Sequence, residues 1–231
     1  MQILGFQKTT LLDFPGRVAA TVFTGGCNFQ CPFCHNRDLV LHPAEMSVFT
    51  TEEIFSHLIR RQRILDGVCI TGGEPTLQPD LEDFIRSVRE LGYAIKLDTN
   101  GYQPDKLIRL CENGLIDYVA MDIKHAPEKY HTICDAADFN LAKIEASVNF
   151  LKQKTVPYEF RTTLVREFHS AEDMTALGEW LSGADAYYLQ PYRDSDTVIQ
   201  SGFHTHDRNT LQTYLELIKP FVATAELRGV D

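Results

Sequence analysis

Several features that mark membrane, secreted or nucleic-acid-binding proteins are missing from this sequence. No apolar run approaches the roughly 20 residues of a membrane-spanning helix. Residues 1–6 show no basic segment followed by an apolar one, so no secretory signal is predicted. Lysine and arginine number 22 against 32 acidic residues, for a net charge of −10, which argues against partners such as nucleic acid and anionic membranes. These absences predict a cytoplasmic protein.

Linkers and low-complexity segments are also missing. The 231 residues contain 44% apolar side chains, enough for a sizeable core, so a single domain over residues 1–231 is predicted. Thiols stay reduced in the cytoplasm. The six cysteines are therefore expected to be ligands or core residues rather than disulfide partners.

Short β-branched, apolar runs alternate with longer amphipathic runs along the chain. Strands are predicted over residues 18–24, 68–71, 94–98, 118–122, 156–165 and 186–190, with a further strand over 221–227. Helices are predicted over residues 51–65, 79–91, 104–113, 140–153, 171–181 and 208–219.

This alternation predicts an α/β fold with a parallel sheet and right-handed crossovers. A closed barrel of eight such units needs about 250 residues. Six units in this length predict an incomplete (βα)6 partial TIM barrel, a splayed parallel sheet with outer helices. Functional residues are expected at the carboxyl ends of the strands.

Three cysteines follow the first predicted strand in a glycine-led loop. Cys27, Cys31 and Cys34 have the spacing C-x3-C-x2-C. Three thiolates so close can bind three corners of a four-iron, four-sulfur cluster, which normally takes four cysteines, and would leave one iron open to a small ligand. One alternative is a zinc site with His35 as fourth ligand, although adjacent ligands suit tetrahedral geometry poorly. Another is three unliganded cysteines.

The triplet resembles the signature of the radical S-adenosylmethionine superfamily, in which an aromatic residue precedes the last cysteine, as Phe33 does here. Within that superfamily the chain is similar to the glycyl-radical-enzyme activating group. Residues 5–8 and 13–16 are similar to the amino-terminal segment of the longer activating proteins of anaerobic ribonucleoside-triphosphate reductase.

The resemblance implies one [4Fe-4S] cluster and S-adenosylmethionine as cofactors. A flavodoxin- or ferredoxin-like donor would reduce the cluster, and reductive cleavage of the cofactor would install a glycyl radical on the reductase. No side chain would act as a catalytic acid, base or nucleophile. Other targets remain open: another glycyl-radical enzyme such as pyruvate formate-lyase, or a small molecule. A non-enzymatic iron–sulfur or zinc module is the remaining alternative.

Three later segments would hold the cofactor if the resemblance is followed residue by residue. The Gly72-Gly73-Glu74 turn would bind the methionine amino group, although a plain turn before a helix is the alternative reading. Lys124 could pair with the methionine carboxylate, and Asp122 could accept from an amine or a ribose hydroxyl. Asp98, Thr99, Met121 and Asp122 would surround a monovalent cation.

Four further residues are assigned to the cofactor site. Phe33 and His35 belong to the cysteine loop. Arg161, on the fifth predicted strand, needs an anionic partner if it is buried. Related enzymes place a ribose-contacting histidine near the end of the sixth strand, where this chain has Tyr192, so the ribose contact is left open.

Overall fold

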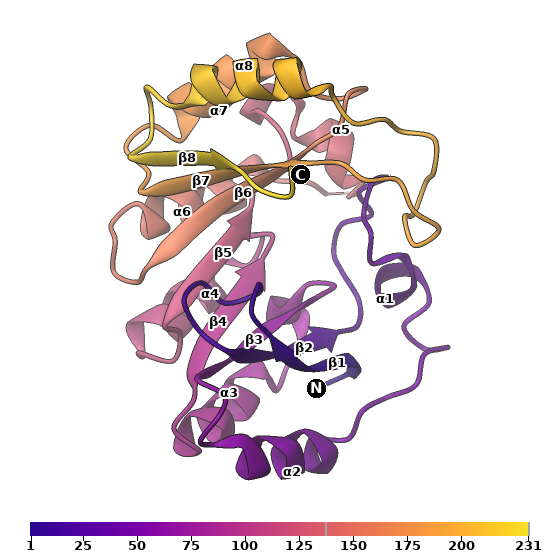
Figure 1. Ribbon diagram of the computed structural model, residues 1–231, viewed down its shortest axis with the longest axis vertical. Helices are drawn as coiled ribbons and strands as arrows, with labels where there is room; N and C mark the ends of the chain where they lie inside the picture. The colour runs from indigo at the N-terminus through magenta and orange to yellow at the C-terminus, as the bar shows by residue number, and fades with distance from the viewer. Residues whose placement is uncertain (137, 231) are drawn as a thin grey trace.

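The computed structural model describes residues 1–136 and 138–230 and is organised around one eight-stranded sheet (Figure 1). The strands lie side by side in chain order. β1 is antiparallel to β2, and each later neighbouring pair is parallel. The bounds are β1 (Ile3–Thr10), β2 (Ala19–Thr24), β3 (Gly67–Gly72), β4 (Ala94–Thr99), β5 (Tyr118–Asp122), β6 (Tyr158–Leu164), β7 (Ala186–Pro191) and β8 (Thr224–Leu227).

Helices connect the parallel strands and cover the outside of the sheet. In Figure 1, α2 and α3 lie at the lower end, near the first strands, and α7 and α8 lie at the upper end, beside β7 and β8. The bounds are α1 (Arg37–Leu41), α2 (Thr51–Arg61), α3 (Leu81–Glu90), α4 (Pro104–Glu112), α5 (His131–Cys134), α6 (Leu141–Leu151), α7 (Ala171–Trp180) and α8 (Arg208–Ile218), with 3-10 turns η1 (Pro75–Leu77) and η2 (Pro127–Lys129).

Burial on both faces explains why short apolar runs form the central strands. Val68 and Ile70 in β3, and Val119 in β5, are completely buried. Two of the covering helices, α2 and α7, begin at capping boxes. In each box the side chain of Thr50 or Ser170 accepts a hydrogen bond from the backbone amide three residues later. The acidic side chain at that later position accepts a hydrogen bond from the backbone amide of Thr50 or Ser170. Each such cap stabilises its helix by about 1 kcal/mol.

The predicted α/β fold with an incomplete, splayed barrel is confirmed. In the described chain, β1 and β8 each pair with a single neighbour, so the sheet does not close. The six predicted strand–helix units correspond to β2 through α8, with ends that differ by a few residues. The predicted helix over 51–65 ends at Arg61, for example, and the last predicted strand, over 221–227, is the shorter β8.

Strand β1 was not predicted from the sequence. Gln7, Lys8 and Thr9 are exposed, and Gly5 has a low strand propensity, so the segment lacks an apolar alternation. Its strand conformation depends on pairing with β2, which a local pattern does not reveal. The short helices α1 and α5 were missed for a related reason, since five and four residues are too few to show a helical period.

None of the helices in the described ranges has the length and apolar content needed to cross a membrane. The carboxyl ends of β2 to β6 meet along one edge of the sheet, and the predicted site residues lie along that edge.

Candidate active site

The cysteine loop runs from the end of β2 to α1 and is held by backbone bonds to distant parts of the chain. The Gln30 amide donates to the carbonyl of Cys134 at 3.0 Å. The amides of Ile199 and Gln200 donate to the carbonyls of Cys34 and Pro32 at 3.0 and 2.8 Å. The loop conformation is therefore set by α5 and by the segment that follows β7.

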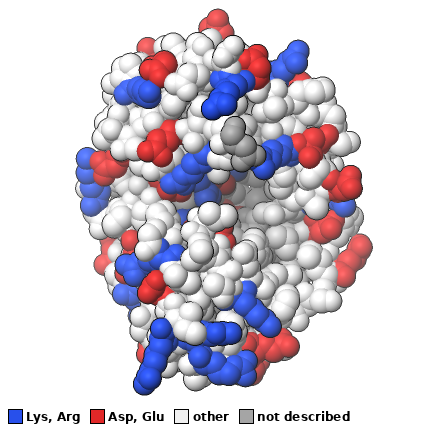
Figure 2. All heavy atoms as spheres, viewed as in Figure 1, with Lys and Arg blue, Asp and Glu red and all other residues white. Residues whose placement is uncertain are grey.

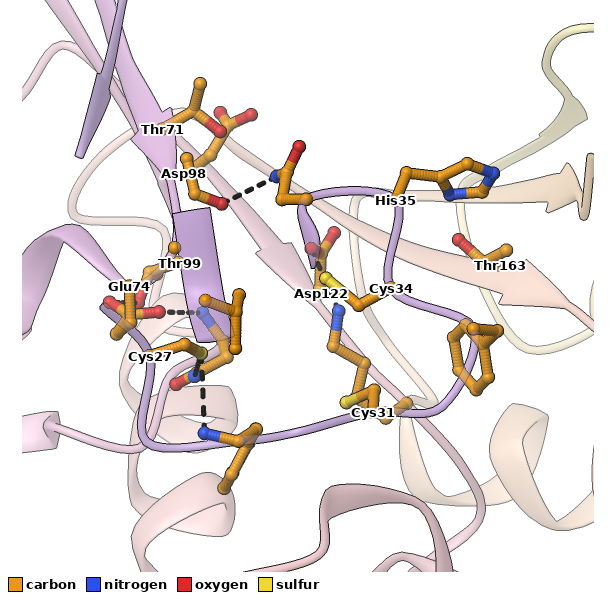
Figure 3. A pocket seen from close by; sticks show the side chains of 18 residues that line it. Cys27, Cys31, Cys34, His35, Thr71, Glu74, Asp98, Thr99, Asp122 and Thr163 are labelled. Carbon is orange, nitrogen blue, oxygen red and sulfur yellow. Dashed lines mark hydrogen bonds and ion pairs between the residues drawn. The ribbon is translucent and has the colours of Figure 1, made fainter. Parts of the chain in front are cut away.

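The three predicted ligand cysteines line one cavity of about 180 Å³ at the carboxyl edge of the sheet. Figure 3 shows the loop arching past this cavity with Cys27 near Glu74, while Cys31 and Cys34 lie farther along the loop. Figure 2 shows a recess near the middle of one face of the molecule. In the described chain no three His, Cys, Asp or Glu side chains are grouped as the ligands of a single metal ion. The thiols face a shared space instead.

Burial and neighbouring charges make the three thiols unequal. Burial, with a smaller contribution from Glu74, raises the pKa of Cys27 to about 12. Burial also raises the pKa of Cys34. A hydrogen bond from the Cys134 thiol lowers the pKa of Cys31, despite burial, and the Lys124 ammonium acts in the same direction. Cys31 is therefore the thiol most readily ionised in this loop.

Cys134 is a fourth thiol near the triplet that sequence spacing did not connect to it. It is fully buried on α5 and hydrogen-bonds to Cys31, but it does not line the cavity. It lies behind Cys31, outside the cavity. The prediction of three cysteine ligands is therefore retained.

The Gly72-Gly73-Glu74 turn packs directly against the cysteine loop. A Cβ atom on Gly73 would lie 2.0 Å from the carbonyl oxygen of Gly26. The Glu74 amide donates to that same oxygen at 2.8 Å. Gly72 has a φ of +113°, and a Cβ there would lie 2.4 Å from the amide nitrogen of Thr24. Glycine is required at both positions because backbone meets backbone.

The Glu74 side chain is buried and joins two segments at this edge. It accepts hydrogen bonds from the Thr76 amide at 3.0 Å, the Thr99 hydroxyl at 2.8 Å and the Asn100 amide at 2.7 Å. Burial raises the pKa of Glu74, and these donors oppose the rise. Its carboxylate ties the turn after β3 to the end of β4. Gly72, Gly73 and Glu74 of this turn all line the cavity.

A chain of alternating charges follows the ends of β4, β5 and β6. Arg161 binds Asp98 through Nη1 at 3.1 Å and Asp122 through Nε at 2.9 Å. Lys124 binds the other oxygen of Asp122 at 3.1 Å. Although burial opposes ionisation, Arg161 and Lys124 lower the pKa of Asp122 to about 2. Asp98, Asp122 and Lys124 line the cavity, and Arg161 connects the two carboxylates from behind.

Two buried histidines hold the backbone next to Lys124. The rings of His125 and His169 stack at 4.9 Å with an interplanar angle of 17°. His169 accepts from the Val165 amide at Nδ1, and its Nε2 lies 3.1 Å from the Lys124 carbonyl. Burial lowers the pKa of both, that of His169 to about 4. The pair is neutral near pH 7 and fixes the segment that carries Lys124.

The cavity brings together most of the predicted cofactor residues. Phe33, His35, Gly72, Gly73, Glu74, Asp98, Thr99, Asp122 and Lys124 all line it, together with the three cysteines. Tyr192 does not line it: its hydroxyl donates to Asp194 at 2.8 Å, and its ring lies 5.6 Å from that of His35. The His35 side chain is itself turned toward the carbonyl of Arg193, at 2.6 Å.

Several residues that line or support the cavity were not identified from the sequence. The Asn36 amide group donates to the Gly72 carbonyl at 2.7 Å and so joins the cysteine loop to the glycine turn. The Asn100 amide group lies 3.8 Å from the Cys27 sulfur. Thr163, on β6, lines the side of the cavity opposite Cys27 (Figure 3). None of these residues carries a distinctive spacing in the sequence.

The residues present suit an iron–sulfur cluster with a small cofactor beside it. Three thiols supply the soft ligands that iron–sulfur clusters use. The side-chain nitrogen of Asn28, beside Cys27, is buried with no hydrogen-bond partner in the described structure, so it offers a donor to a sulfur-rich anion. Lys124, at the other side of the cavity, offers an ammonium to a carboxylate.

Relatives of known sequence match this chain over most or nearly all of its length. A candidate glycyl-radical enzyme activating enzyme of Methanocaldococcus jannaschii is 34% identical over 236 residues, covering 99% of this chain and 96% of that protein. The pyruvate formate-lyase-activating enzyme of Listeria monocytogenes is 31% identical over 186 residues, covering 74% of this chain and 71% of the relative.

Solved structures share the fold. SuiB of Streptococcus suis, in a crystal structure with S-adenosylmethionine, has a TM-score of 0.69 at 14% identity; the match covers 89% of this chain and 49% of SuiB. At that identity the similarity concerns the fold alone. The family model of the radical SAM superfamily matches residues 21–177, which include the triplet, the glycine turn and the charged strand ends. The chain therefore belongs to the radical SAM superfamily, in its group of glycyl-radical-enzyme activating enzymes, and is an oxidoreductase.

Proposed function

We propose that this protein binds one [4Fe-4S] cluster through Cys27, Cys31 and Cys34 and installs a glycyl radical on anaerobic ribonucleoside-triphosphate reductase. The convergence of the three thiols, the glycine turn and Lys124 on one cavity supports the activating role. The choice of reductase is supported by the segments at residues 5–8 and 13–16, which are similar to activating proteins of that enzyme.

When bound, the cluster supplies one electron for cleavage of S-adenosylmethionine, which allows a hydrogen atom to be taken from a glycine of the partner. The chain's own residues position and enclose the reactants. Backbone groups of Gly72 and Gly73 would hold the amino group, and Lys124 would pair with the methionine carboxylate. Although burial disfavours a charged lysine, Asp122 and the thiolates of Cys31 and Cys34 raise the pKa of Lys124, which keeps the ammonium charged.

The unclosed sheet suits a macromolecular substrate. The cavity lies at the carboxyl edge of a sheet that does not close between β1 and β8, and a partner's glycine loop would approach at that edge. Phe33 packs against Phe168 at 5.8 Å, so the cysteine loop is covered on one side by the segment after β6. That cover restricts water on one side and leaves the open side for the partner.

Activation of pyruvate formate-lyase is the second candidate. The observation that favours it is the similarity to activating enzymes of that protein, at 31% identity in the Listeria relative. A flavodoxin- or ferredoxin-like protein is the electron donor we propose for either target.

The test incubates the reconstituted protein anaerobically with S-adenosylmethionine, a reductant and either target enzyme. We expect a glycyl-radical signal by electron paramagnetic resonance on the reductase, with formation of 5′-deoxyadenosine. A signal only on pyruvate formate-lyase would establish the second candidate. Cofactor cleavage without a signal on either protein would reject both targets, and tightly bound zinc without iron would reject the radical function.

A further inference from the structure

The carboxylates expected to bind a monovalent cation have no free oxygen. The resemblance assigned that cation to Asp98, Thr99, Met121 and Asp122. Asp98 Oδ2 is bound by Arg161 Nη1 at 3.1 Å, and Asp98 Oδ1 by Lys96 Nζ. Asp122 Oδ1 is bound by Arg161 Nε at 2.9 Å, and Oδ2 by Lys124 Nζ at 3.1 Å. Each of the four oxygens already has a cationic donor.

The two remaining assigned ligands are also engaged elsewhere. Thr99 donates its hydroxyl to Glu74 at 2.8 Å and accepts from the Gly101 amide at 3.1 Å. Met121 is fully buried, and its terminal methyl group fills the space where a Cβ of Gly101 would lie. A cation bound through side chains at this position would have to displace the bonds of Asp98, Asp122 and Thr99.

Lys96 is the group that makes this arrangement unusual. Its side chain is 2% exposed, on β4, with Nζ bound to Asp98 and 3.8 Å from the Cys69 sulfur. A fully buried ammonium is rare unless it is paired. The Cys69 sulfur also lies 3.7 Å from Asp98. Lys96 therefore holds a fixed positive charge on the side of Asp98 opposite Arg161.

We propose that the ammonium of Lys96 and the guanidinium of Arg161 take the place of the alkali-metal cation in this chain. Three cationic side chains, those of Lys96, Arg161 and Lys124, surround the two carboxylates of Asp98 and Asp122. Counted by themselves, these five side chains carry one excess positive charge, which disfavours a further cation between the two carboxylates. The excess charge is matched when the carboxylate of S-adenosylmethionine enters, a step that rests on the proposed function.

The first experiment measures cation dependence in the unmodified protein. S-adenosylmethionine affinity of the cluster-loaded protein and thermal unfolding of the cofactor-free protein are compared in potassium, sodium and choline chloride at equal ionic strength. We expect differences below about twofold in affinity, because the internal cations are always present. Affinity at least tenfold weaker in choline, restored by potassium or sodium, would overturn the proposal.

The second experiment uses Lys96→Met, which keeps the aliphatic stem of the side chain and removes its charge. In this variant the affinity for S-adenosylmethionine should depend on the added cation. We expect affinity in choline to fall on the order of tenfold, and potassium or sodium to recover a large part of it. Lys219→Met removes the same charge from an exposed position and should change nothing. A folded Lys96→Met protein with wild-type affinity in all three salts would contradict the role of Lys96.

The unfolding measurement separates this inference from the proposed function. If S-adenosylmethionine does not bind at all, the proposed function fails, while the salt dependence of unfolding still tests the internal cations. Unfolding that is insensitive to the salt in the unmodified protein supports the inference. If Lys96→Met does not fold, the measurements on the unmodified protein decide the question alone.

Discussion

The two sides of the cavity are built in different ways. On the side of β2 and β3, backbone lies directly on backbone: Gly26 meets Gly73, and Gly72 meets Thr24, at distances that exclude even a methyl group. On the side of β4 to β6, charged side chains meet one another through ion pairs that link Lys96 to Lys124. The glycine side depends on shape and the charged side on electrostatics, so the two should respond differently to substitution.

Cys31→Ala should produce the largest effect, because it removes one of the three proposed cluster ligands. We expect loss of cluster assembly and of all cofactor cleavage, since two thiolates do not hold a cluster of this type. Iron and sulfide content after anaerobic reconstitution, with the visible absorption of the cluster, measures the effect.

Two other cysteines supply the controls for Cys31→Ala. Cys111→Ala changes a half-buried thiol on α4, and Cys134→Ala removes the hydrogen bond to Cys31 without removing a cavity-lining thiol. Both should retain the cluster. Cluster loss in Cys134→Ala would mean that a fourth cysteine is needed as a ligand.

Gly73→Ala should destabilise the protein by about 3 kcal/mol or more, because the added methyl group meets the Gly26 carbonyl rather than a movable side chain. Chemical denaturation of the cofactor-free protein measures the loss. Gly114→Ala is the matched control: Gly114 has a φ of +65° but no neighbour within 4 Å of the added atom, so only backbone strain of about 1 kcal/mol is expected. Equal losses in the two variants would refute the close-contact explanation.

His169→Gln tests the support behind the charged side. The pKa of His169 falls from 6.5 to about 4 on folding because the ring is buried, so the unfolded chain binds the extra proton first as the pH drops. Stability from this group is present above pH 6.5 and decreases by about 2 kcal/mol between pH 7 and pH 5. Glutamine can donate to Lys124 without titrating, so the variant should show a flatter profile.

Denaturation midpoints across this pH range check the His169 prediction. His42→Gln, at an exposed position, should keep the wild-type profile. His125, Asp173 and Lys129 lie in the same neighbourhood and are unchanged in both proteins. An unaltered profile in His169→Gln would place the pH sensitivity in another group.

Asn100→Ala should give the smallest effect on function, through the cluster's electronic properties. It removes an N–H group 3.8 Å from the Cys27 sulfur and leaves the backbone bond from residue 100 to Glu74 intact. It also removes the side-chain hydrogen bonds to Asn28 and from the Tyr102 amide. Hydrogen bonds to cluster sulfur raise the reduction potential, so we expect a modest decrease at unchanged iron content. Anaerobic redox titration measures it, and an unchanged potential would remove Asn100 from the set of tuning residues.

The two sides also differ in how far the sequence alone reveals them. Cysteine spacing is a local pattern with few structural explanations, so the triplet was predicted directly. The Gly72-Gly73-Glu74 turn was assigned through the resemblance, because paired glycines alone also predict a plain turn. Asp122 and Lys124 could be placed because charge at a buried strand end needs a partner. Lys96 was missed because a lysine inside a predicted strand gives no indication of which residue it meets across the sheet.

Residues that act through tertiary contacts could not be predicted for the same reason. Cys134 reaches Cys31 across about one hundred residues of sequence, and His169 reaches Lys124 across forty-five. Tyr192 was placed at the cofactor by analogy of position, whereas its hydroxyl binds Asp194. Such contacts depend on how loops fold over the sheet edge, and no local period encodes that.

The backbone hydrogen bonds that hold the cysteine loop determine when the loop can take its final conformation during synthesis. Cys27 to Cys34 leave the ribosome early, but the amides of Ile199 and Gln200 that hold the loop belong to the last part of the chain. Until those residues emerge, the three thiols lack the bonds that fix their spacing. The newborn chain thus lacks a formed ligand set until residues 199 and 200 have emerged, so the proposed cluster site is completed by their arrival rather than by the appearance of its cysteines.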